Sequence, residues 1–390
     1  MKDLSIYIHI PFCVRKCFYC DFLSFPISDE AFAATCGTVL GPSPRTAMEN
    51  YVNLLQKEIV GSAAKYKEYR VLSIFWGGGT PSVLPAKEVG RIMGTIRKHY
   101  RIAEDAEITI EMNPDTVTEE KLHEYITYGI NRISIGLQSA DDDELARIGR
   151  IHDYRTFERA YELARRLGFH NINIDLMAAL PEQSVSFYER TLKRVADLAP
   201  EHISAYSLTL EEGTPLYKLK NKFSFPTEEE DRRMYALTGE YLASCGYHRY
   251  EISNYALDGF ECRHNKVYWQ RGNYVGFGLG ASSMTENIRW TNPADVERYC
   301  AGHKAARQVL TSHEQMEEYM FLGLRMMCGV GVQEFADEFG TRIETVYGDI
   351  VNKMCEQGLL VQEHGRIRLT ERGIDVSNYV MAQFLFDEMD

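Results

Sequence analysis

Three cysteines stand close together near the start of the sequence, in the stretch PFCVRKCFYCDF. Cys13, Cys17 and Cys20 have the spacing C-x3-C-x2-C, and this stretch holds no fourth cysteine. Because an iron–sulfur cube normally takes one thiolate per iron, three cysteines on one short loop leave one iron without a protein ligand. The spacing therefore predicts a [4Fe-4S] centre with one open coordination position.

A structural zinc site is the alternative for this loop, with His9 as a fourth ligand beside the three thiolates. His9 falls within a predicted strand, and no second CxxC pair completes a zinc ribbon, so the iron–sulfur centre is preferred. The nine cysteines of the chain are an odd number and mostly scattered, which does not fit a secreted disulfide framework. We therefore expect a reducing compartment.

The charge and the N-terminus narrow the class of protein further. A net charge of −13 argues against a general nucleic-acid binder, because contact with the phosphate backbone is mostly cationic. The first residues, MKDLSIYIHIPF, lack the order of charged, apolar and small residues found in a signal peptide, and no apolar run reaches the length of a spanning helix. We expect a soluble cytoplasmic protein with no nucleic-acid partner.

Short β-rich apolar runs alternate with helical stretches in the first half of the chain. This alternation predicts a parallel sheet, and nearly continuous apolar strands predict that both faces of the sheet are buried. We expect an α/β fold with a partial parallel (β/α)6 barrel, whose chemistry lies at the carboxyl ends of the strands. The predicted strands cover residues 5–10, 71–76, 108–112, 132–137, 171–177 and 202–208.

Three units are predicted along the chain. Residues 1–225 form the barrel, and residues 226–311 form an α+β extension of strands and loops packed beside it. Residues 312–390 form a C-terminal winged-helix-like domain, whose second long helix is not basic and therefore favours a packing or partner surface over DNA. Residues 28–48 interrupt the first βα connection and are expected to form a surface loop, with a lid beside the cysteines as the alternative.

Further motifs at the predicted strands occur together with the cysteine motif. The stretch YIHIPFCVRKCFYCDF and the blocks FWGGGTPS, EMNPD, RISIGLQS and NINIDLM resemble the radical S-adenosylmethionine (SAM) superfamily, in its coproporphyrinogen-oxidase-like branch. The resemblance covers roughly residues 5–300, and the winged unit also matches. It implies that Cys13, Cys17 and Cys20 hold a [4Fe-4S] cluster and that the amine and carboxylate of SAM chelate the free iron.

The same resemblance assigns SAM contacts to residues near the strand ends. Gly78 and Gly79 let the backbone approach the methionyl end of SAM, because no side chain intervenes. The Glu111 carboxylate is able to accept hydrogen bonds from two ribose hydroxyls, and the Arg150 guanidinium is able to pair with a carboxylate through two bonds. The full set implied for SAM is Tyr7, Tyr19, Gly78, Gly79, Thr80, Glu111, Gln138, Arg150 and Asp175.

Two further features resemble the haem-chaperone members of this branch. Cys20 is followed by Asp21 and a phenylalanine, whereas coproporphyrinogen III dehydrogenases place another cysteine there, after a longer N-terminal segment. The tract HNKVYW offers the imidazole of His264 as an axial haem ligand and the rings of Tyr268 and Trp269 as flat surface for a porphyrin. The resemblance therefore implies a haem chaperone that binds haem and a SAM-liganded cluster.

Three other functions stay open at this point. They are a coproporphyrinogen III dehydrogenase, a radical SAM methyltransferase or cyclopropane-forming enzyme with two SAM molecules, and a cluster-bearing sensor that acts through the winged unit. The acidic balance of the chain disfavours the sensor. No catalytic residue is assigned. The expected partners are haem and recipient haemoproteins, including ones at the membrane surface, with a homodimer as the expected assembly.

Overall fold

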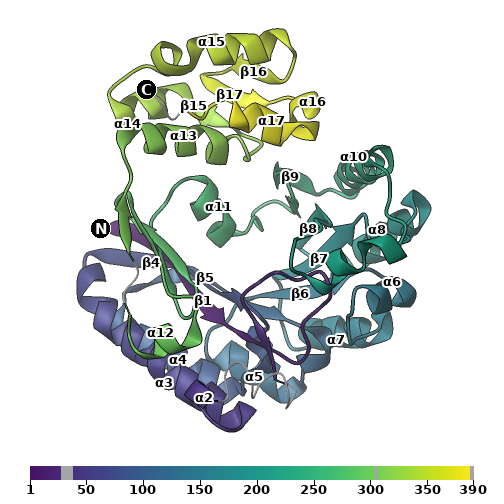
Figure 1. Cartoon of the computed structure of the whole chain (residues 1–390), viewed down its shortest axis with the longest axis vertical. Coiled ribbons are helices and arrows are strands. Elements are labelled where there is room, and N and C mark those ends of the chain that lie inside the picture. The colour runs from purple at the N-terminus through teal and green to yellow at the C-terminus, as the bar shows by residue number, and fades with distance from the viewer. Residues whose placement is uncertain (28–37, 304–305, 387–390) are drawn as a thin grey trace.

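A mixed sheet of 12 strands runs through the main body of the molecule (Figure 1). The computed structural model describes residues 1–27, 38–303 and 306–386. In spatial order the strands are β14 (Arg307–Val309), β13 (Ile288–Thr291), β12 (Ser282–Thr285), β11 (Tyr274–Phe277), β1 (Lys2–Ile10), β4 (Tyr69–Gly78), β5 (Ile102–Met112), β6 (Arg132–Gln138), β7 (Ile172–Ala178), β8 (His202–Ser207), β10 (Asn254–Ala256) and β9 (His248–Glu251).

The strands from β11 to β8 in this order are parallel, and the strands outside them pair in the antiparallel direction. All six predicted strands are present, and every residue of β6 is buried. The predicted α/β class with a partial parallel sheet is therefore confirmed. Strand β11 was not predicted as a parallel neighbour of β1, because its partner lies more than 260 residues away in the sequence.

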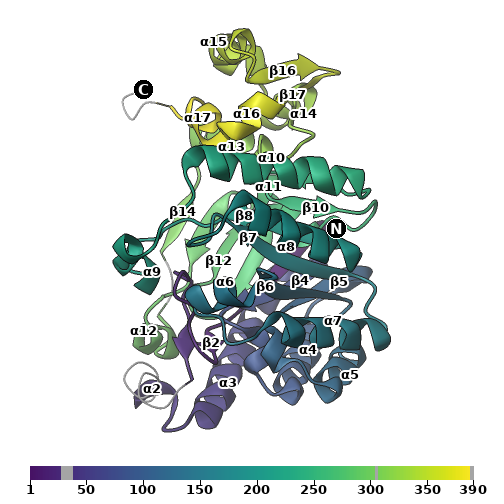
Figure 2. The same cartoon turned by 90° about the vertical axis from the view of Figure 1, so that its right-hand side faces the viewer.

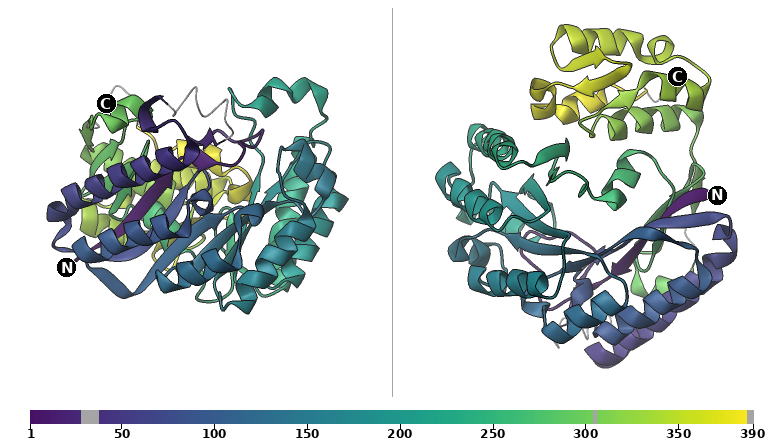
Figure 3. Two further views of the ribbon diagram at one scale, coloured as in Figure 1. Left: turned by 90° about the horizontal axis from the view of Figure 1, so that it is seen from below. Right: turned by 180° about the vertical axis from the view of Figure 1, so that it is seen from behind.

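Helices between the parallel strands cover the outer face of the sheet (Figures 1 and 3). Their apolar faces are buried against the strands, as residues such as Leu55 of the first helix and Ile92 of the second illustrate. The predicted N-cap Thr118 accepts a hydrogen bond from the backbone of Lys121. The covering helices are α3 (Pro44–Ser62), α4 (Ala86–His99), α5 (Glu119–Thr127), α6 (Asp142–Arg147), α7 (Tyr154–Arg166) and α8 (Val185–Asp197).

Part of the segment 28–48, predicted as a loop, is helical. Residues 38–40 form the short helix α2, and α3 already begins at Pro44. Proline suits the first turn of a helix, and the Ser43 side chain caps this one by accepting a hydrogen bond from Thr46 N. The loop prediction is therefore wrong for residues 44–48. The lid alternative depends on residues 28–37, which lie outside the described part of the chain.

The C-terminal unit has a hydrophobic core of its own, formed around Met320, Phe335, Tyr347 and Phe384. The three predicted helices and the hairpin are present, and a short strand joins the hairpin in the order β15-β17-β16 (Figures 1 and 2). These elements are α13 (Ser312–Gly323), α14 (Val332–Phe339), α15 (Ile343–Glu356), β15 (Val330–Gly331), β16 (Leu360–Glu363) and β17 (Arg366–Leu369), followed by α16 (Glu371–Asp375) and α17 (Ser377–Ala382).

Residues 226–311 do not simply pack beside the sheet. Helix α10 (Glu228–Ser244) leads into β9 and β10 at one edge, whereas β11 to β14 extend the opposite edge. The boundaries of the three predicted units stay predictions. No helix in the described parts of the chain combines the length and the apolarity that crossing a bilayer requires.

The HNKVYW tract, expected within strands and loops, forms the helix α11 (Arg263–Trp269). The carboxylate of Glu107, on β5, accepts hydrogen bonds from the backbone nitrogens of Arg263 (3.1 Å) and His264 (3.2 Å). These two contacts satisfy free N–H groups in the first turn of the helix. The local prediction was wrong because the group that caps this helix comes from a distant strand.

Candidate functional site

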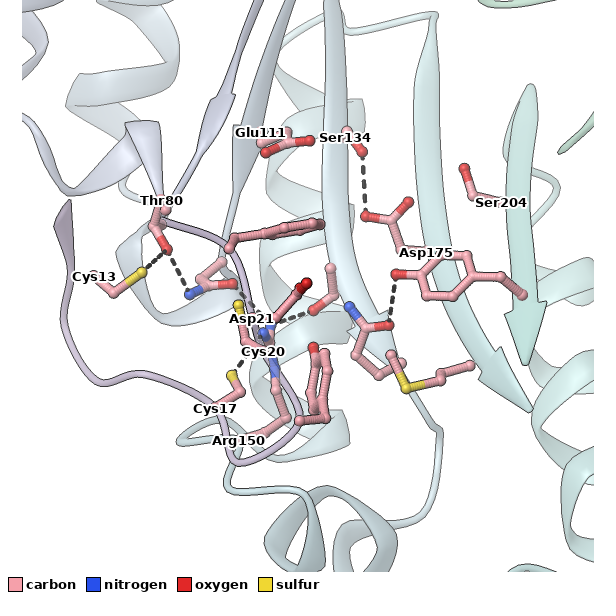
Figure 4. A pocket seen from close by; sticks show the side chains of 18 of the residues that line it. Cys13, Cys17, Cys20, Asp21, Thr80, Glu111, Ser134, Arg150, Asp175 and Ser204 are labelled. Carbon is pink, nitrogen blue, oxygen red and sulfur yellow. Dashed lines mark hydrogen bonds between the residues drawn. The ribbon is translucent and has the colours of Figure 1, made fainter. Parts of the chain in front are cut away.

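A pocket of about 520 Å³ opens at the carboxyl ends of the parallel strands. The three cysteines line it together with all of the residues predicted for SAM except Tyr7. Figure 4 shows Cys13, Cys17 and Cys20 toward one end of this pocket, and Glu111, Ser134 and Asp175 on its far side. Residues from five parallel strands and the cysteine loop therefore face one another around a single cavity.

Contacts at Cys13 and Cys17 hold the cysteine loop in place. Cys13 lies in β2 (Phe12–Cys13), which pairs in parallel with β3 (Phe25–Pro26), and its sulfur accepts a hydrogen bond from the Thr80 hydroxyl at 3.5 Å. The sulfur of Cys17 accepts one from Arg150, also at 3.5 Å. Burial raises the pKa of the Cys20 thiol to about 11, so a bound cation is needed to favour its thiolate.

The zinc alternative is not supported by the position of His9. Its Nε2 lies 2.8 Å from the carbonyl oxygen of Leu23, and its Nδ1 lies 3.2 Å from the Tyr7 hydroxyl. Within residues 1–27, 38–303 and 306–386, no three His, Cys, Asp or Glu side chains converge as for one metal ion. Thiolates that bind different irons of a cluster do not need to meet at a single point.

The glycines of the GGGTPS block fit tightly against the base of the cysteine loop. Gly78 has a φ of 108°, and a Cβ at this position would lie 2.6 Å from the His9 ring. A Cβ on Gly79 would lie 2.7 Å from the carbonyl oxygen of Phe12 and 3.1 Å from the Cys13 sulfur. Both glycines also line the pocket. Their lack of side chains therefore serves the packing of the loop as well as the approach of a ligand.

Two carboxylates occupy the far side of the pocket. Burial raises the pKa of Glu111 to about 8, and the charge of Asp175 adds to this shift. Burial also raises the pKa of Asp175, which accepts hydrogen bonds from Asn173 Nδ2 (2.7 Å) and Ser134 Oγ (3.3 Å). Two desolvated carboxyl groups facing one cavity form a site that is suited to hydroxyl groups of a ligand.

Arg150 is the buried cation of the pocket, with 9% of its surface exposed. Its Nη2 donates hydrogen bonds to Asn113 Oδ1 at 2.8 Å and to the carbonyl oxygen of Gly136 at 2.5 Å. Its Nε is buried without a partner among the described residues. The guanidinium is therefore fixed beside the Cys17 sulfur, with part of its hydrogen-bonding capacity unused.

Gln138 and Tyr19 also belong to the predicted SAM residues that line the pocket. Gln138 ends β6 with a φ of 75°, next to an irregularity in the pairing of β6 with β7, and its Oε1 accepts a hydrogen bond from Tyr206. Left-handed backbone at a non-glycine residue carries strain, which proteins retain mainly at functional positions. Tyr19 packs against Ile148 and Met177, so its ring forms an apolar side of the cavity.

Tyr7 and His264 lie outside the pocket lining. The ring of His264 is buried and stacks on Phe75, with a centroid distance of 5.1 Å. Its Nδ1 lies 2.8 Å from Ser73 Oγ, and its Nε2 lies 2.9 Å from the Tyr268 hydroxyl. Because the Ser73 hydroxyl donates to Ser5, Nδ1 carries the proton, and the Nε2 lone pair accepts from Tyr268. Burial, reinforced by the charge of Arg132, lowers the pKa of His264 to about 3 and keeps it neutral.

Several residues that line the pocket were not singled out from the sequence. Asn113 lies two residues after Glu111 and bridges Thr80 to Arg150, so its place in the EMNPD block was a usable signal. Asn265 reaches the pocket from α11 although its neighbour His264 does not, and no local pattern distinguishes the two. Other lining residues of this kind are Arg15, Lys16, Ser134, Ser204, Tyr206, Ser207, Thr209, Glu211 and Asn254.

Comparisons with known proteins agree with this geometry. Residues 7–195 match the radical SAM superfamily, and residues 310–376 match the HemN C-terminal domain. The chain is 38% identical to the heme chaperone HemW of Escherichia coli, over 99% of each chain, and 34% identical to that of Bacillus subtilis, over 98% of this chain and 99% of the relative. This chain belongs to the HemW family of radical SAM proteins. Membership implies a SAM molecule and a [4Fe-4S] cluster.

A solved structure shows the same fold. The coproporphyrinogen III oxidase HemN from Escherichia coli superposes with a TM-score of 0.83 at 22% identity, over 98% of this chain and 90% of that one. The HemW family and this oxidase therefore share one scaffold, and the fold alone does not separate haem delivery from haem synthesis. The pocket fits the implied group in this chain, since three sulfurs, a cradle of glycines and an incompletely satisfied arginine surround it.

Proposed function

We propose that this protein is a haem chaperone that binds haem together with a SAM-liganded [4Fe-4S] cluster and delivers haem to haemoproteins. One observation carries the proposal: the three sulfurs and the strand-end polar groups meet in one pocket, in a chain whose full length matches heme chaperones named HemW. Recipient haemoproteins, including ones at the membrane surface, are the proposed partners, and a homodimer is the proposed assembly.

Specific residues are proposed to hold each part of the cofactor. Cys13, Cys17 and Cys20 hold the cluster, and when bound the cluster with SAM supplies one-electron chemistry. Glu111 and Asp175 orient hydroxyl groups of SAM. Arg150 stabilises the negative charge of the cluster sulfurs or of the SAM carboxylate, because it is permanently charged and held beside Cys17. The remaining proposed contacts are Tyr7, Tyr19, Gly78, Gly79, Thr80 and Gln138.

Ligation of haem iron by His264 stays a prediction, and its contacts set a condition on it. The Nε2 lone pair, which would bind the iron, already accepts the hydrogen bond from Tyr268. Haem ligation there would require displacement of Tyr268 and exposure of a ring that is 2% exposed. Loss of the haem Soret band in His264→Ala would support the prediction, whereas an unchanged band would contradict it.

Anaerobic purification and cluster reconstitution test the proposed function directly. The protein is expected to contain iron and acid-labile sulfide, to form a Soret band with ferric haem, and to pass that haem to an apo-haemoprotein. The same preparation is assayed for 5′-deoxyadenosine and for conversion of coproporphyrinogen III to protoporphyrinogen IX. Conversion at an enzyme-like rate, with no haem transfer, would contradict the chaperone and favour the oxidase.

A further inference from the structure

A second hollow, larger than the cysteine pocket, runs along the C-terminal half of α3. It has a volume of about 1120 Å³, against about 520 Å³ for the cysteine pocket. Its walls come from α3, from the 3-10 turn η2 (Ala63–Tyr66), from the sheet edge at β11, β13 and β14, and from the short helix α12 (Val296–Cys300) with the turn after it. We call this hollow the α3 groove.

Basic side chains surround the α3 groove without acidic partners. Lys57, Lys65 and Arg307 line it, and none of the three has a carboxylate oxygen within 4.0 Å among the described residues. Such a gathering is unusual in a chain with a net charge of −13. The nearby charge of Arg307 adds to burial in lowering the pKa of Lys65, so these two cations lie close enough to repel each other. An anionic ligand would relieve that repulsion.

The one acidic side chain lining the groove is already engaged, as far as the described residues show. Glu58 accepts hydrogen bonds from the Tyr299 hydroxyl (2.8 Å), from Asn292 Nδ2 (2.7 Å) and from Gly278 N (3.0 Å). Burial raises the pKa of Glu58 despite these bonds. Glu286 acts on Lys65 from outside the lining, but it pairs with Lys2 and accepts a hydrogen bond from Tyr69. The groove therefore keeps a surplus of positive charge.

A flat aromatic ring contacts both of the cations that repel each other. The Lys65 ammonium stands 4.3 Å from the ring centroid of Trp290, and the Arg307 guanidinium stands 5.4 Å from it. Trp290 is partly exposed, and the buried ring of Phe277 also lines the groove. Both cations therefore lie over the Trp290 ring. A flat dicarboxylate ligand would pair with the two cations and stack on the ring in their place.

The groove also presents a histidine as a candidate ligand. His303 is exposed, and its ring nitrogens have no hydrogen bond to any described residue; only its backbone N–H is used, by donation to the Arg298 carbonyl. The preceding Gly302 has a φ of 72°, and a Cβ there or on Gly61 would meet nothing within 4 Å. The imidazole is therefore accessible to solvent, and the glycine before it adjoins open space. This is the opposite of His264, whose two nitrogens are both hydrogen-bonded in the interior.

We propose that the α3 groove is the haem-binding site, with His303 as the iron ligand, Lys65 and Arg307 as the partners of the two propionates, and Trp290 as a contact for the macrocycle. This assignment deepens the proposed function and rests on it. A porphyrin needs flat apolar surface, two cations and an imidazole, and the groove holds all three. The cluster and SAM are proposed to occupy the cysteine pocket, which leaves haem to bind elsewhere.

Titration of the full-length, cluster-reconstituted protein with ferric haem tests the assignment. His303→Ala is expected to shift the Soret band and to raise the Kd for haem at least about tenfold, because one coordination bond is lost. The matched control is His123→Ala, which removes another exposed histidine, on α5, and is expected to leave band and Kd unchanged. His264→Ala is expected to keep the Soret position, which would contradict ligation by His264; loss of the band in that variant would instead contradict the groove assignment.

The charge reversal Lys65→Glu/Arg307→Glu tests the propionate contacts separately. It is expected to raise the Kd for haem and the Kd for iron-free protoporphyrin IX by similar factors, on the order of tenfold, since both ligands carry the two carboxylates. The control Arg155→Glu/Arg159→Glu applies the same change of charge to exposed positions of α7. His303→Ala is expected to leave the iron-free porphyrin unaffected, because that ligand has no metal to coordinate.

The outcomes separate the groove from the proposed function. Haem binding that is unchanged in both groove variants would overturn the groove assignment and leave the chaperone intact. Failure of the unmodified protein to bind haem at all would overturn the chaperone proposal itself. If the charge reversal weakened the binding of both haem and iron-free porphyrin while His303→Ala changed neither, the role of His303 as the ligand would be overturned.

Discussion

The cysteine pocket and the α3 groove differ in how their polar groups are used. In the pocket, buried groups such as Arg150 and Asp175 are held by hydrogen bonds to neighbouring side chains and backbone. In the groove, Lys57, Arg307 and His303 are exposed and have no acidic partner among the described residues. The polar groups of the pocket are therefore held in place before a ligand binds, and their burial costs desolvation free energy. The groove is instead suited to a ligand that binds and leaves.

This difference suits a protein with a resident cofactor and a transferable cargo. A cluster held by three thiolates is expected to stay with the chain, because its ligands lie on a loop that contacts at Cys13 and Cys17 hold in place. A cargo must be released to a recipient, which favours contacts made by exposed side chains at the molecular surface. Variants of each region test whether the two regions are independent, with expected effects that range from loss of the cluster to a change in pH dependence.

The largest effect is expected from removal of one cluster ligand. Cys17→Ala should reduce iron and acid-labile sulfide in the reconstituted protein to background, as measured by chemical analysis and visible absorption. Haem affinity should change less than about twofold, because distant, independent sites have additive energies. Cys245→Ala, at an exposed cysteine outside the loop, is the matched control and should retain the cluster. A parallel loss of haem binding in Cys17→Ala would show that the two regions are coupled.

Removal of the buried cation Arg150 should lower both stability and SAM affinity, which is a smaller effect than loss of the cluster. Arg150→Ala leaves Asn113 Oδ1 and the Gly136 carbonyl without their donor, so we expect a loss of about 3 kcal/mol in the free energy of unfolding, measured with urea. We also expect the Kd for SAM to rise more than about tenfold. Arg155→Ala, on the exposed side of α7, is the control. An unchanged SAM affinity would remove Arg150 from the proposed site.

Substitution of the two histidines should have different effects on stability as well as on haem binding. His264→Ala removes a buried ring and breaks its bonds to Ser73 and Tyr268, so a loss of about 2 kcal/mol is expected. His303→Ala should change the free energy of unfolding by less than about 0.5 kcal/mol, because the ring is exposed. Chemical denaturation of the haem-free protein measures both, and equal effects would contradict the contrast between them.

The smallest effect is a pH dependence from Glu111, whose pKa is raised from 4.5 to about 8. Between these values the folded chain keeps a proton that the unfolded chain has lost, so stability falls as the pH rises toward 8. Glu111→Gln should remove this slope, so that the variant without SAM loses less stability between pH 5 and pH 8.5 than the unmodified protein does. Glu119→Gln, exposed on α5, is the control, and an unchanged slope in Glu111→Gln would contradict the raised pKa.

Much of the pocket was accessible from the sequence because it follows local rules. The six apolar runs identified the parallel strands, and the residues at their ends then had to meet at one edge of the sheet. Glu111, Gln138 and Asp175 could be placed in this way before any contact was known. Tyr7 could not, because whether a residue early in β1 reaches the cavity depends on the packing of Phe75 and His264 beside it.

The HNKVYW tract shows where sequence reasoning failed. Its composition predicted strands and loops, but the carboxylate of Glu107 caps it as the helix α11. The orientation of that helix buries His264 and turns Asn265 toward the pocket. A residue whose type would suit it as a metal ligand can thus be buried in the interior because of a contact with a residue more than 150 positions away in the sequence.

By itself the sequence determined the α/β class, the cluster loop and most of the strand-end groups around the cysteine pocket. These depend on periodicity, spacing and the common direction of parallel strands, all of which are local or repetitive. Only the tertiary structure decided which histidine is exposed and which is buried, and where cations gather with no carboxylate partner among the described residues. The pairing of β11 with β1 brings α12 and His303 beside α3, and no local pattern encodes a contact between segments so far apart.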